Sequence, residues 1–244
     1  MKIEVKNLSK KFNNTLAVRN VNFTVENNKT LGILGPNGCG KTTTIGMMLG
    51  LIKPTHGNIL IDDNDINKVN KIPILSVMNF ASPYIELPKK LTVRQNLEIY
   101  ARLYGVNNIE NRINNISIDL DLKKILDKKN GELSSGQKNR VSLAKSLINK
   151  PKILFLDEPT ASLDPDVGDF VRRYIEDYKS NNELTILLAS HNMSEVEKLC
   201  DSVIMMKEGS IVDRGTCKEL TNKHGRNNLE ETFLKIARGK NELE

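Results

Sequence analysis

The 244-residue sequence predicts an α/β fold with a mostly parallel sheet, because short apolar runs alternate with segments of helical pattern along the chain. Two further observations refine this prediction. In the first thirty residues apolar and polar residues alternate, as at Ile3 and Val5, which predicts an N-terminal antiparallel β region. Residues of about 88–150 are helix-rich, which predicts a helical subdomain inserted into the sheet-bearing core. We therefore expect one domain over 1–220 and a C-terminal helical extension over 221–244.

The strands are predicted from short apolar runs and the helices from local start signals. The runs lie at 31–34, 57–61, 74–78, 153–157, 184–189 and 203–207. Thr92 is followed three residues later by Gln95, which is the pattern of a capping box. Asp164 before Pro165 predicts a helix N-cap with proline in the first helical position. Helices are also expected over 41–51 and 138–148.

Composition narrows the class of protein. With 39% hydrophobic and 27% charged residues, the chain resembles an ordinary globular protein, and no apolar run approaches the 18 residues of a membrane-spanning helix. The three cysteines lack metal-ligand spacing and suit a reducing compartment. The net charge of +6 is spread without a dense basic run, so no nucleic acid is expected as a partner. We expect the chain in the cytosol unless a partner carries it to a membrane.

One segment carries the clearest chemistry. It fits the pattern G-x-x-x-x-G-K-[ST] and consists of Gly35, Pro36, Asn37, Gly38, Cys39, Gly40, Lys41 and Thr42. Glycines let the backbone wrap a polyphosphate, while the lysine reaches the β- and γ-phosphates and the threonine hydroxyl binds Mg²⁺. A short apolar run precedes the segment and a helical pattern follows it, so the helix N-terminus would add to an anion site. The segment predicts a P-loop NTPase core that binds a nucleoside triphosphate, with Thr43 also contacting the nucleotide.

A second constellation ends the strand expected over 153–157. Its last residue is Asp157, and Glu158 follows directly. In P-loop enzymes an aspartate in this place holds Mg²⁺. The next carboxylate is placed to polarise an attacking water. Asp157 is therefore predicted as a metal ligand and Glu158 as a catalytic residue.

One further segment indicates a protein family, and it reads Leu133-Ser134-Ser135-Gly136-Gln137. It lies before a helical run and upstream of the acidic pair, and it is similar to the LSGGQ signature of ATP-binding cassette (ABC) transporters. From residue 1 to about 220 the chain resembles the nucleotide-binding subunit of such a transporter. The resemblance implies that Ser134, Gly136 and Gln137 bind the γ-phosphate of the ATP held by a partner subunit. Ser135 replaces the usual glycine.

The resemblance assigns further residues. Ser162-Leu163-Asp164 resembles the D-loop, in which Asp164 lies at the dimer interface. His191 matches the switch histidine, which contacts the γ-phosphate and Glu158 in this family. Phe12 matches the aromatic residue that stacks on adenine, with an edge or core phenylalanine as the alternative. His56 and His224 are predicted to be surface residues.

The sequence departs from the family at the Q-loop glutamine. Ser82 stands at the best-matching position and Asn79 is the next candidate. A serine is shorter than glutamine and could reach Mg²⁺ only through a water, so we expect one weakened contact without loss of hydrolysis. Cys39 suggests a further hypothesis, that Lys41 and the helix N-terminus lower the thiol pKa and that alkylation blocks ATP binding. The alternative for Cys39 is a small filling residue.

The resemblance implies an ATPase that uses ATP and Mg²⁺ and acts as a homodimer or heterodimer with a similar subunit. It would power transport through a separate membrane permease, at the cytoplasmic face of the cell membrane. Residues 82–105 are the expected permease-docking surface, and the segments 91–97 and 228–235 resemble those of bacterial exporters. Two alternatives stay open. One is a soluble ABC ATPase that acts on ribosomes or nucleic acid, and the other is a regulatory subunit that hydrolyses ATP poorly.

Overall fold

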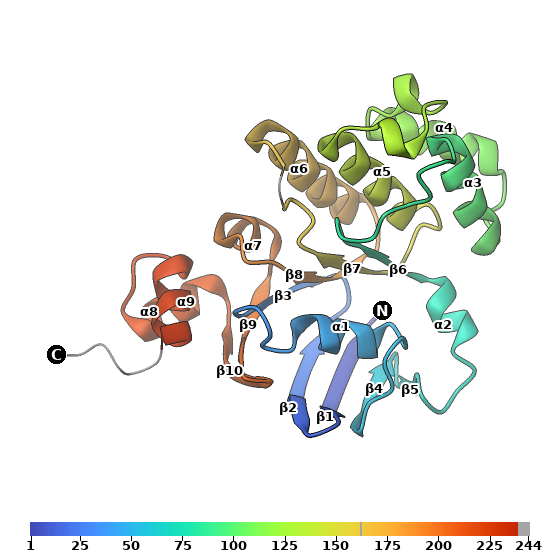
Figure 1. The fold of residues 1–244 in the computed structure, drawn as a ribbon. Coiled ribbons are helices and arrows are strands. Elements are labelled where there is room, and N and C mark those ends of the chain that lie inside the picture. The colour runs from blue at the N-terminus through green and yellow to red at the C-terminus, as the bar shows by residue number, and fades with distance from the viewer. Residues whose placement is uncertain (162, 239–244) are drawn as a thin grey trace. The chain divides into compact units, whose positions relative to one another are not determined.

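The computed structural model describes residues 1–161 and 163–238, which form two compact units. The first, which we call the sheet unit, comprises Met1–Ile74 and the chain from Leu184 onward. The second, the helical unit, is Leu75–Glu183. Figure 1 traces both units along the chain.

An antiparallel sheet opens the sheet unit, as the alternating pattern predicts. Its strands are β1 (Ile3–Phe12), β2 (Thr15–Val25), β4 (His56–Ile61) and β5 (Asn64–Asp65), in the order β2-β1-β4-β5. The apolar residues of the alternation face the core, since Ile3, Val5 and Leu8 are buried. The predicted antiparallel region is confirmed.

Parallel strands form the centre of the sheet unit. β3 (Thr30–Leu34) pairs in parallel with β8 (Thr185–Ala189) and with β9 (Ser202–Lys207), while β10 (Ser210–Gly215) is antiparallel to β9. Every residue of β3 and β8 is buried, as expected for strands covered on both faces. Because these two strands are neighbours and parallel, the segments that follow them leave the sheet at the same edge.

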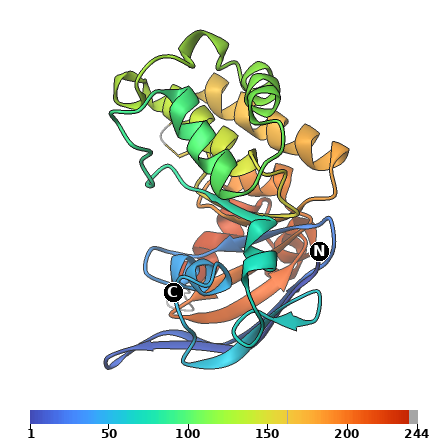
Figure 2. The ribbon, with the colours of Figure 1, turned by 90° about the vertical axis from the view of Figure 1, so that its right-hand side faces the viewer.

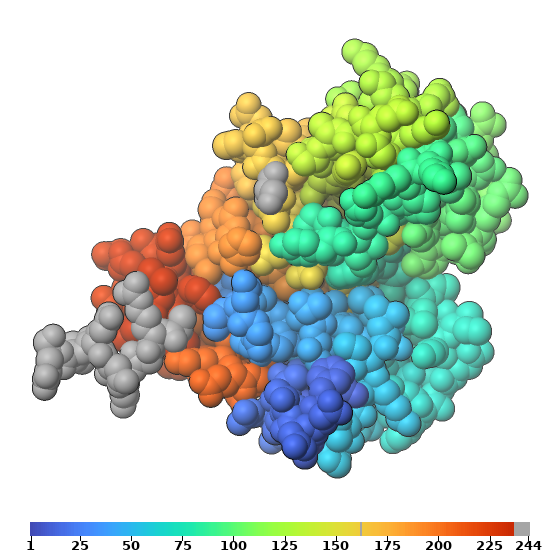
Figure 3. Space-filling model, in the orientation of Figure 1, coloured from blue at the N-terminus to red at the C-terminus, as the bar shows by residue number. Residues whose placement is uncertain are grey.

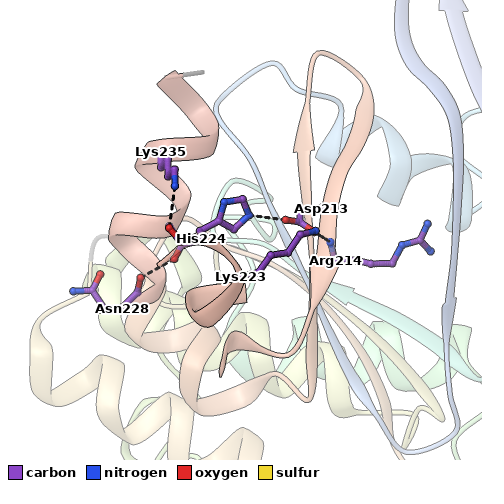
Figure 4. Close-up of polar contacts among 7 residues, drawn as sticks. Asp213, Arg214, Lys223, His224, Asn228 and Lys235 are labelled. Carbon is purple, nitrogen blue, oxygen red and sulfur yellow. Dashed lines mark hydrogen bonds and ion pairs between the residues drawn. The ribbon is translucent and has the colours of Figure 1, made fainter. Parts of the chain in front are cut away.

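Helices complete the sheet unit. α1 (Lys41–Met48) follows β3, and α7 (Met193–Leu199) follows β8. The C-terminal helices α8 (Cys217–His224) and α9 (Leu229–Arg238) pack on each other, and α8 contacts β10. Figure 4 shows how Asp213 of β10 binds the last two residues of α8, Lys223 and His224. Within the predicted extension over 221–244, α8 ends at His224 and α9 covers Leu229–Arg238, while 239–244 lie outside the described residues.

The helical unit pairs β6 (Met78–Ala81) in parallel with β7 (Ile153–Asp157). Its helices are α3 (Val93–Leu103), α4 (Ile109–Asp119), the 3₁₀ helices η1 (Lys123–Ile125) and η2 (Asn130–Glu132), α5 (Ser135–Leu147) and α6 (Pro165–Asn181). α5 packs against β6 and α3, and α3 also packs against α4. Figure 2 shows these helices from the side. The Thr92 hydroxyl accepts the Gln95 N–H and the Gln95 side chain accepts the Thr92 N–H, so the predicted capping box is present.

Some predicted bounds were wrong. The run 74–78 was expected to be a strand, but residues Ile72–Ser76 form the short helix α2, and the strand β6 begins only at Met78. Pro73 suits the first turn of a helix, and an apolar run this short does not distinguish the two structures. α1 ends at Met48 instead of residue 51, because Gly50 adopts a left-handed conformation with φ of 68°. α5 begins at Ser135, three residues earlier than expected.

Across the described ranges 1–161 and 163–238, the structure contains no helix that is both long enough and apolar enough to cross a membrane.

Candidate nucleotide-binding site

The loop between β3 and α1 is a tight backbone turn. Gly38 and Gly40 have φ of 79° and 104°, in the region that glycine favours. A Cβ atom on Gly40 would lie 2.6 Å from the Ala17 carbonyl oxygen, and one on Gly35 would lie 2.3 Å from Cys39 Sγ. Side chains are therefore excluded at both positions, which leaves a cradle made of backbone.

Lys41 begins α1 and lies over this cradle. Its ammonium Nζ donates to the carbonyl oxygens of Gly35 at 2.6 Å and Pro36 at 3.2 Å, and the residue is only 9% exposed. A buried ammonium with neutral partners is strongly stabilised by an anion, and the N-terminus of α1 adds its positive dipole end. This arrangement favours an anion such as phosphate as its ligand.

The neighbouring hydroxyls and Cys39 differ in exposure. Thr42 is exposed and Thr43 is half-buried, while Cys39 is buried. Burial raises the pKa of the Cys39 thiol, and this effect outweighs the opposing charge of Lys41. The prediction of a lowered thiol pKa was therefore wrong, because it considered the charges around Cys39 and not its desolvation.

His191 follows β8 and is exposed at the edge of the sheet where the phosphate cradle leaves β3. Sheet topology therefore brings this histidine and the cradle to the same edge of one unit. Phe12 ends β1 and is 46% exposed, which excludes a core position. Lys10 Nζ lies 4.8 Å from the Phe12 ring centroid.

In the helical unit, the acidic pair lies where the sequence predicts it. Asp157 is the last residue of β7 and Glu158 is the next residue, and both are buried. Glu158 has a φ of 54°, which is uncommon for a residue with a side chain and costs about 1–3 kcal/mol. The Glu158 carbonyl accepts the N–H of Ala161 at 3.0 Å, which closes the turn that holds this conformation. Backbone strain of this kind clusters at functional sites.

Mg²⁺ fits the chemistry of the predicted ligands. It prefers hard oxygen ligands and often binds through one or two protein groups together with phosphate and water. The Thr42 hydroxyl and the Asp157 carboxylate are of this kind. Within the described residues, no three or more His, Cys, Asp and Glu side chains gather into a site that could hold a metal by itself.

The signature segment begins α5. Ser134 is the N-cap residue, and its hydroxyl oxygen accepts the Gln137 N–H at 3.3 Å, while Gln137 Oε1 accepts the Ser134 N–H at 3.1 Å. This capping box fixes the helix N-terminus, and Ser134 is exposed there with a hydroxyl proton still available for donation. A Cβ on Gly136 would lie 3.3 Å from a Val167 methyl carbon, so α6 approaches closely at this point.

The D-loop prediction falls partly outside the described residues, because Ser162 is not among them. Asp164 occupies the N-cap position of α6 and Pro165 the first turn, as predicted. The Asp164 side chain makes no capping hydrogen bond and is exposed. It is therefore accessible to a partner.

The two candidates for the Q-loop position differ in their contacts. Asn79 lies in β6 with its side chain tied to α5 and the segment after it, since Nδ2 donates to Asn149 Oδ1 at 3.0 Å and Lys145 Nζ donates to Asn79 Oδ1 at 3.4 Å. Ser82 follows β6, is buried, and accepts the Tyr84 N–H at 3.3 Å. The Asn79 amide is thus already used in packing, and the assignment of Ser82 to the Q-loop position stays a prediction.

Ser82 also lines a cavity of about 230 Å³ within the helical unit. The segment 82–87, Asn130 and the first turns of α5, including Ser135, contribute to its wall. Asn130 is 3% exposed and its Nδ2 donates to the Leu87 carbonyl at 3.1 Å, while Oδ1 has no hydrogen-bond partner among the described residues. Sequence reasoning missed Asn130, since a lone asparagine before the signature carries no motif.

His224 corrects another prediction. It was expected to be a surface residue, yet its side chain is only 20% exposed and Nε2 lies 2.6 Å from Asp213 Oδ2. The pairing was not foreseen because the partners lie on different elements, β10 and α8. His56 is exposed, as predicted.

Known proteins resemble this chain in sequence and in fold. The family model described as "ABC transporter" matches residues 18–161. The ABC transporter ATP-binding protein NatA of Bacillus subtilis is 35% identical over 91% of this chain and 92% of its own length. The zinc import ATP-binding protein ZnuC of Rickettsia bellii is 38% identical over 90% of this chain and 88% of its own.

Solved structures agree. The structure of an ATP-binding subunit of an ABC transporter superposes with a TM-score of 0.87 and 25% identity over 96% of this chain and 98% of that one. A dimeric ATP-binding cassette in a post-hydrolysis state, bound to ADP and phosphate, has a TM-score of 0.80 at 23% identity, over 88% of this chain and 98% of its own, and supports the fold. The chain belongs to the ABC transporter family and is an ATP-binding, ATP-hydrolysing subunit.

Proposed function

We propose that this chain powers transport through a separate membrane subunit by binding and hydrolysing ATP. The observation that carries the proposal is the phosphate cradle, in which buried Lys41 lies over backbone that two glycines keep free of side chains. The signature segment and the acidic pair occur in the same chain, in the family's order.

Each predicted residue has a role toward the nucleotide. Lys41 and the loop amides stabilise charge on the phosphates, and Phe12 stacks on the adenine. Thr42 and Asp157 would hold Mg²⁺, and the bound ion would neutralise negative charge on the phosphates. Glu158 orients the attacking water and His191 contacts the γ-phosphate. Ser82 acts on the Mg²⁺ shell only through a water, because its side chain is short.

The signature segment acts on a second nucleotide. Ser134, Gly136 and Gln137 at the N-terminus of α5 present a hydroxyl and a helix dipole to an anion, and exposed Asp164 lies at the interface with the partner subunit. We propose that two such subunits close on two ATP molecules. ATP then favours the closed state by binding it more tightly, and this differential affinity drives the membrane subunit.

The membrane subunit docks on residues 82–105. Figure 3 shows the segment after β6, in sea-green, along the surface of the helical unit beside the yellow-green segment near residue 130. Tyr84 is 72% exposed and Ile85 is also exposed, and both line the cavity of about 230 Å³. Exposed apolar side chains beside a cavity suit a partner segment that brings an apolar side chain. Docking here would hold the chain at the cytoplasmic face of the membrane.

We propose export as the direction of transport, on the strength of the segments 91–97 and 228–235. Similar proteins named for zinc, methionine and spermidine/putrescine import make import the competing direction. Uptake of substrate into inside-out vesicles that carry the complex would support export, because their cytoplasmic face is outside.

The function is tested by purification of tagged Glu158→Gln from gently solubilised native membranes. The substitution slows hydrolysis and holds the closed complex, so an integral membrane protein is expected at stoichiometric yield. Glu176→Gln changes an exposed glutamate of α6 and serves as the matched control. Less of the integral membrane protein is expected to copurify with this control than with Glu158→Gln. Recovery from the soluble fraction with ribosomes or nucleic acid would overturn the transporter proposal.

A further inference from the structure

The turn that carries His191 is closed by a ring of three hydrogen bonds. The Ser190 hydroxyl donates to Glu195 Oε2, and its oxygen accepts the Asn192 N–H at 3.1 Å. Asn192 Oδ1 in turn accepts the Glu195 N–H at 3.3 Å. The residues on both sides of His191 are therefore tied to the first turn of α7.

The centre of this ring is buried. Ser190 and Glu195 have no exposed surface, whereas His191 between the ring members is exposed. A fully buried carboxylate is rare and costly unless hydrogen bonds satisfy it. Glu195 accepts the Ser190 proton and lies in the first turn of α7, where the helix dipole favours negative charge. The ring therefore anchors an exposed side chain to a rigid interior.

The ring lies close to the expected site of the γ-phosphate. The turn leaves β8 at the sheet edge where the phosphate cradle leaves β3. An exposed imidazole on a free turn would sample several positions, and ordering it costs conformational entropy. A turn that is fixed in advance avoids this cost when the transition state forms.

We propose that Glu195 is a positioning residue for ATP hydrolysis, which acts through Ser190 to hold His191 toward the γ-phosphate. This inference rests on the role proposed for His191. Glu195 itself does not touch the nucleotide. Its removal lowers the rate of the chemical step and leaves nucleotide affinity nearly unchanged.

The test is steady-state phosphate release by the purified full chain over a range of Mg-ATP concentrations. Glu195→Ala and Ser190→Ala are expected to lower kcat roughly 10–100-fold, with KM for ATP changed less than about threefold. Glu195→Gln is expected to restore kcat to within about threefold of the parent, because its amide oxygen also accepts the Ser190 proton. Ser117→Ala, at a buried serine of α4 that bonds the Asn114 carbonyl, is the control for loss of a buried hydroxyl.

The outcomes separate the two proposals. If His191→Ala keeps its kcat, the proposed role of His191 is wrong. If His191→Ala loses activity while Glu195→Ala stays within about twofold of the parent, the positioning role is wrong. An equal loss in Glu195→Ala and Glu195→Gln, together with lower thermal stability, would show a merely structural residue.

A second variant tests the proposal if Glu195→Ala fails to fold. Should Glu195→Ala not fold, Asn192→Ala opens the same ring at an exposed position, where the loss of a cap costs about 1 kcal/mol. A lower kcat at unchanged KM then supports the proposal, and an unchanged kcat overturns it.

Discussion

Single residues of the phosphate loop show how burial and charge compete. Cys39 lies two positions before Lys41 and next to a helix N-terminus, both of which favour a thiolate. The side chain is nevertheless buried, with Sγ packed against Gly35, and burial raises its pKa. Cys39 therefore fills space in the loop, and its charge environment does not make it reactive.

Cys39 should consequently react slowly with a maleimide at pH 7. We expect its rate to be at least about tenfold below that of a small free thiol, because the thiol is mostly protonated and shielded. The measurement is labelling over time, with peptide mass spectrometry to separate Cys39 from the half-buried Cys200 and Cys217. If Cys39 were labelled ahead of both other cysteines, this account would be contradicted and the hypothesis of a reactive Cys39 thiolate would stand again.

At the scale of elements, one carboxylate joins the C-terminal helices to the sheet. Asp213 of β10 binds Lys223 Nζ at 2.7 Å and His224 Nε2 at 2.6 Å, and its side chain is 7% exposed. Lys235 of α9 donates to the His224 carbonyl at 2.9 Å, so the contact extends to the second helix (Figure 4). Burial would raise the pKa of Asp213, but the hydrogen bonds from Lys223 and His224 outweigh it and hold the pKa below 3.8.

Asp213→Asn is therefore expected to lower the free energy of unfolding by about 1–2 kcal/mol at pH 7, a figure reduced for the exposure of Lys223. Because the pKa of Asp213 is lowered on folding, its contribution is present above pH 3.8 and is lost as the pH falls through the folded value. The difference between variant and parent should therefore shrink below about pH 4. Urea unfolding of the full chain at several pH values measures it.

Asp127→Asn supplies the control for that measurement. Asp127 is 83% exposed and pairs with Arg94 at 3.3 Å, so its loss should cost less than about 0.5 kcal/mol. Equal effects of the two variants would show that Asp213 is an ordinary surface charge.

At the scale of the whole molecule, motifs with fixed spacing were predicted well and contacts between distant segments were not. Local residue order accounts for the glycine pattern at 35–42, the strand that ends at Asp157 and the capping box at Thr92. The partnership of His224 with Asp213 and the unpaired oxygen of Asn130 depend on tertiary packing. The run 74–78 was misassigned because a short apolar segment carries too few periods to separate a helix from a strand.

The proposed dimer makes the last prediction. In Glu158→Gln, Mg-ATP should convert the chain from monomer to dimer, because ATP is bound by one subunit's cradle and the other's signature segment and is not hydrolysed. Light scattering coupled to size exclusion should then give twice the mass of one chain.

Two double variants serve as controls for this dimer. Adding Lys41→Ala removes the cradle's ammonium, and adding Ser134→Arg blocks the exposed N-terminus of α5, so both double variants should stay monomeric. The Ser134→Arg double variant should still bind ATP, since its own cradle is intact. Its dimerisation with ATP would show that the signature segment does not contact the partner's nucleotide.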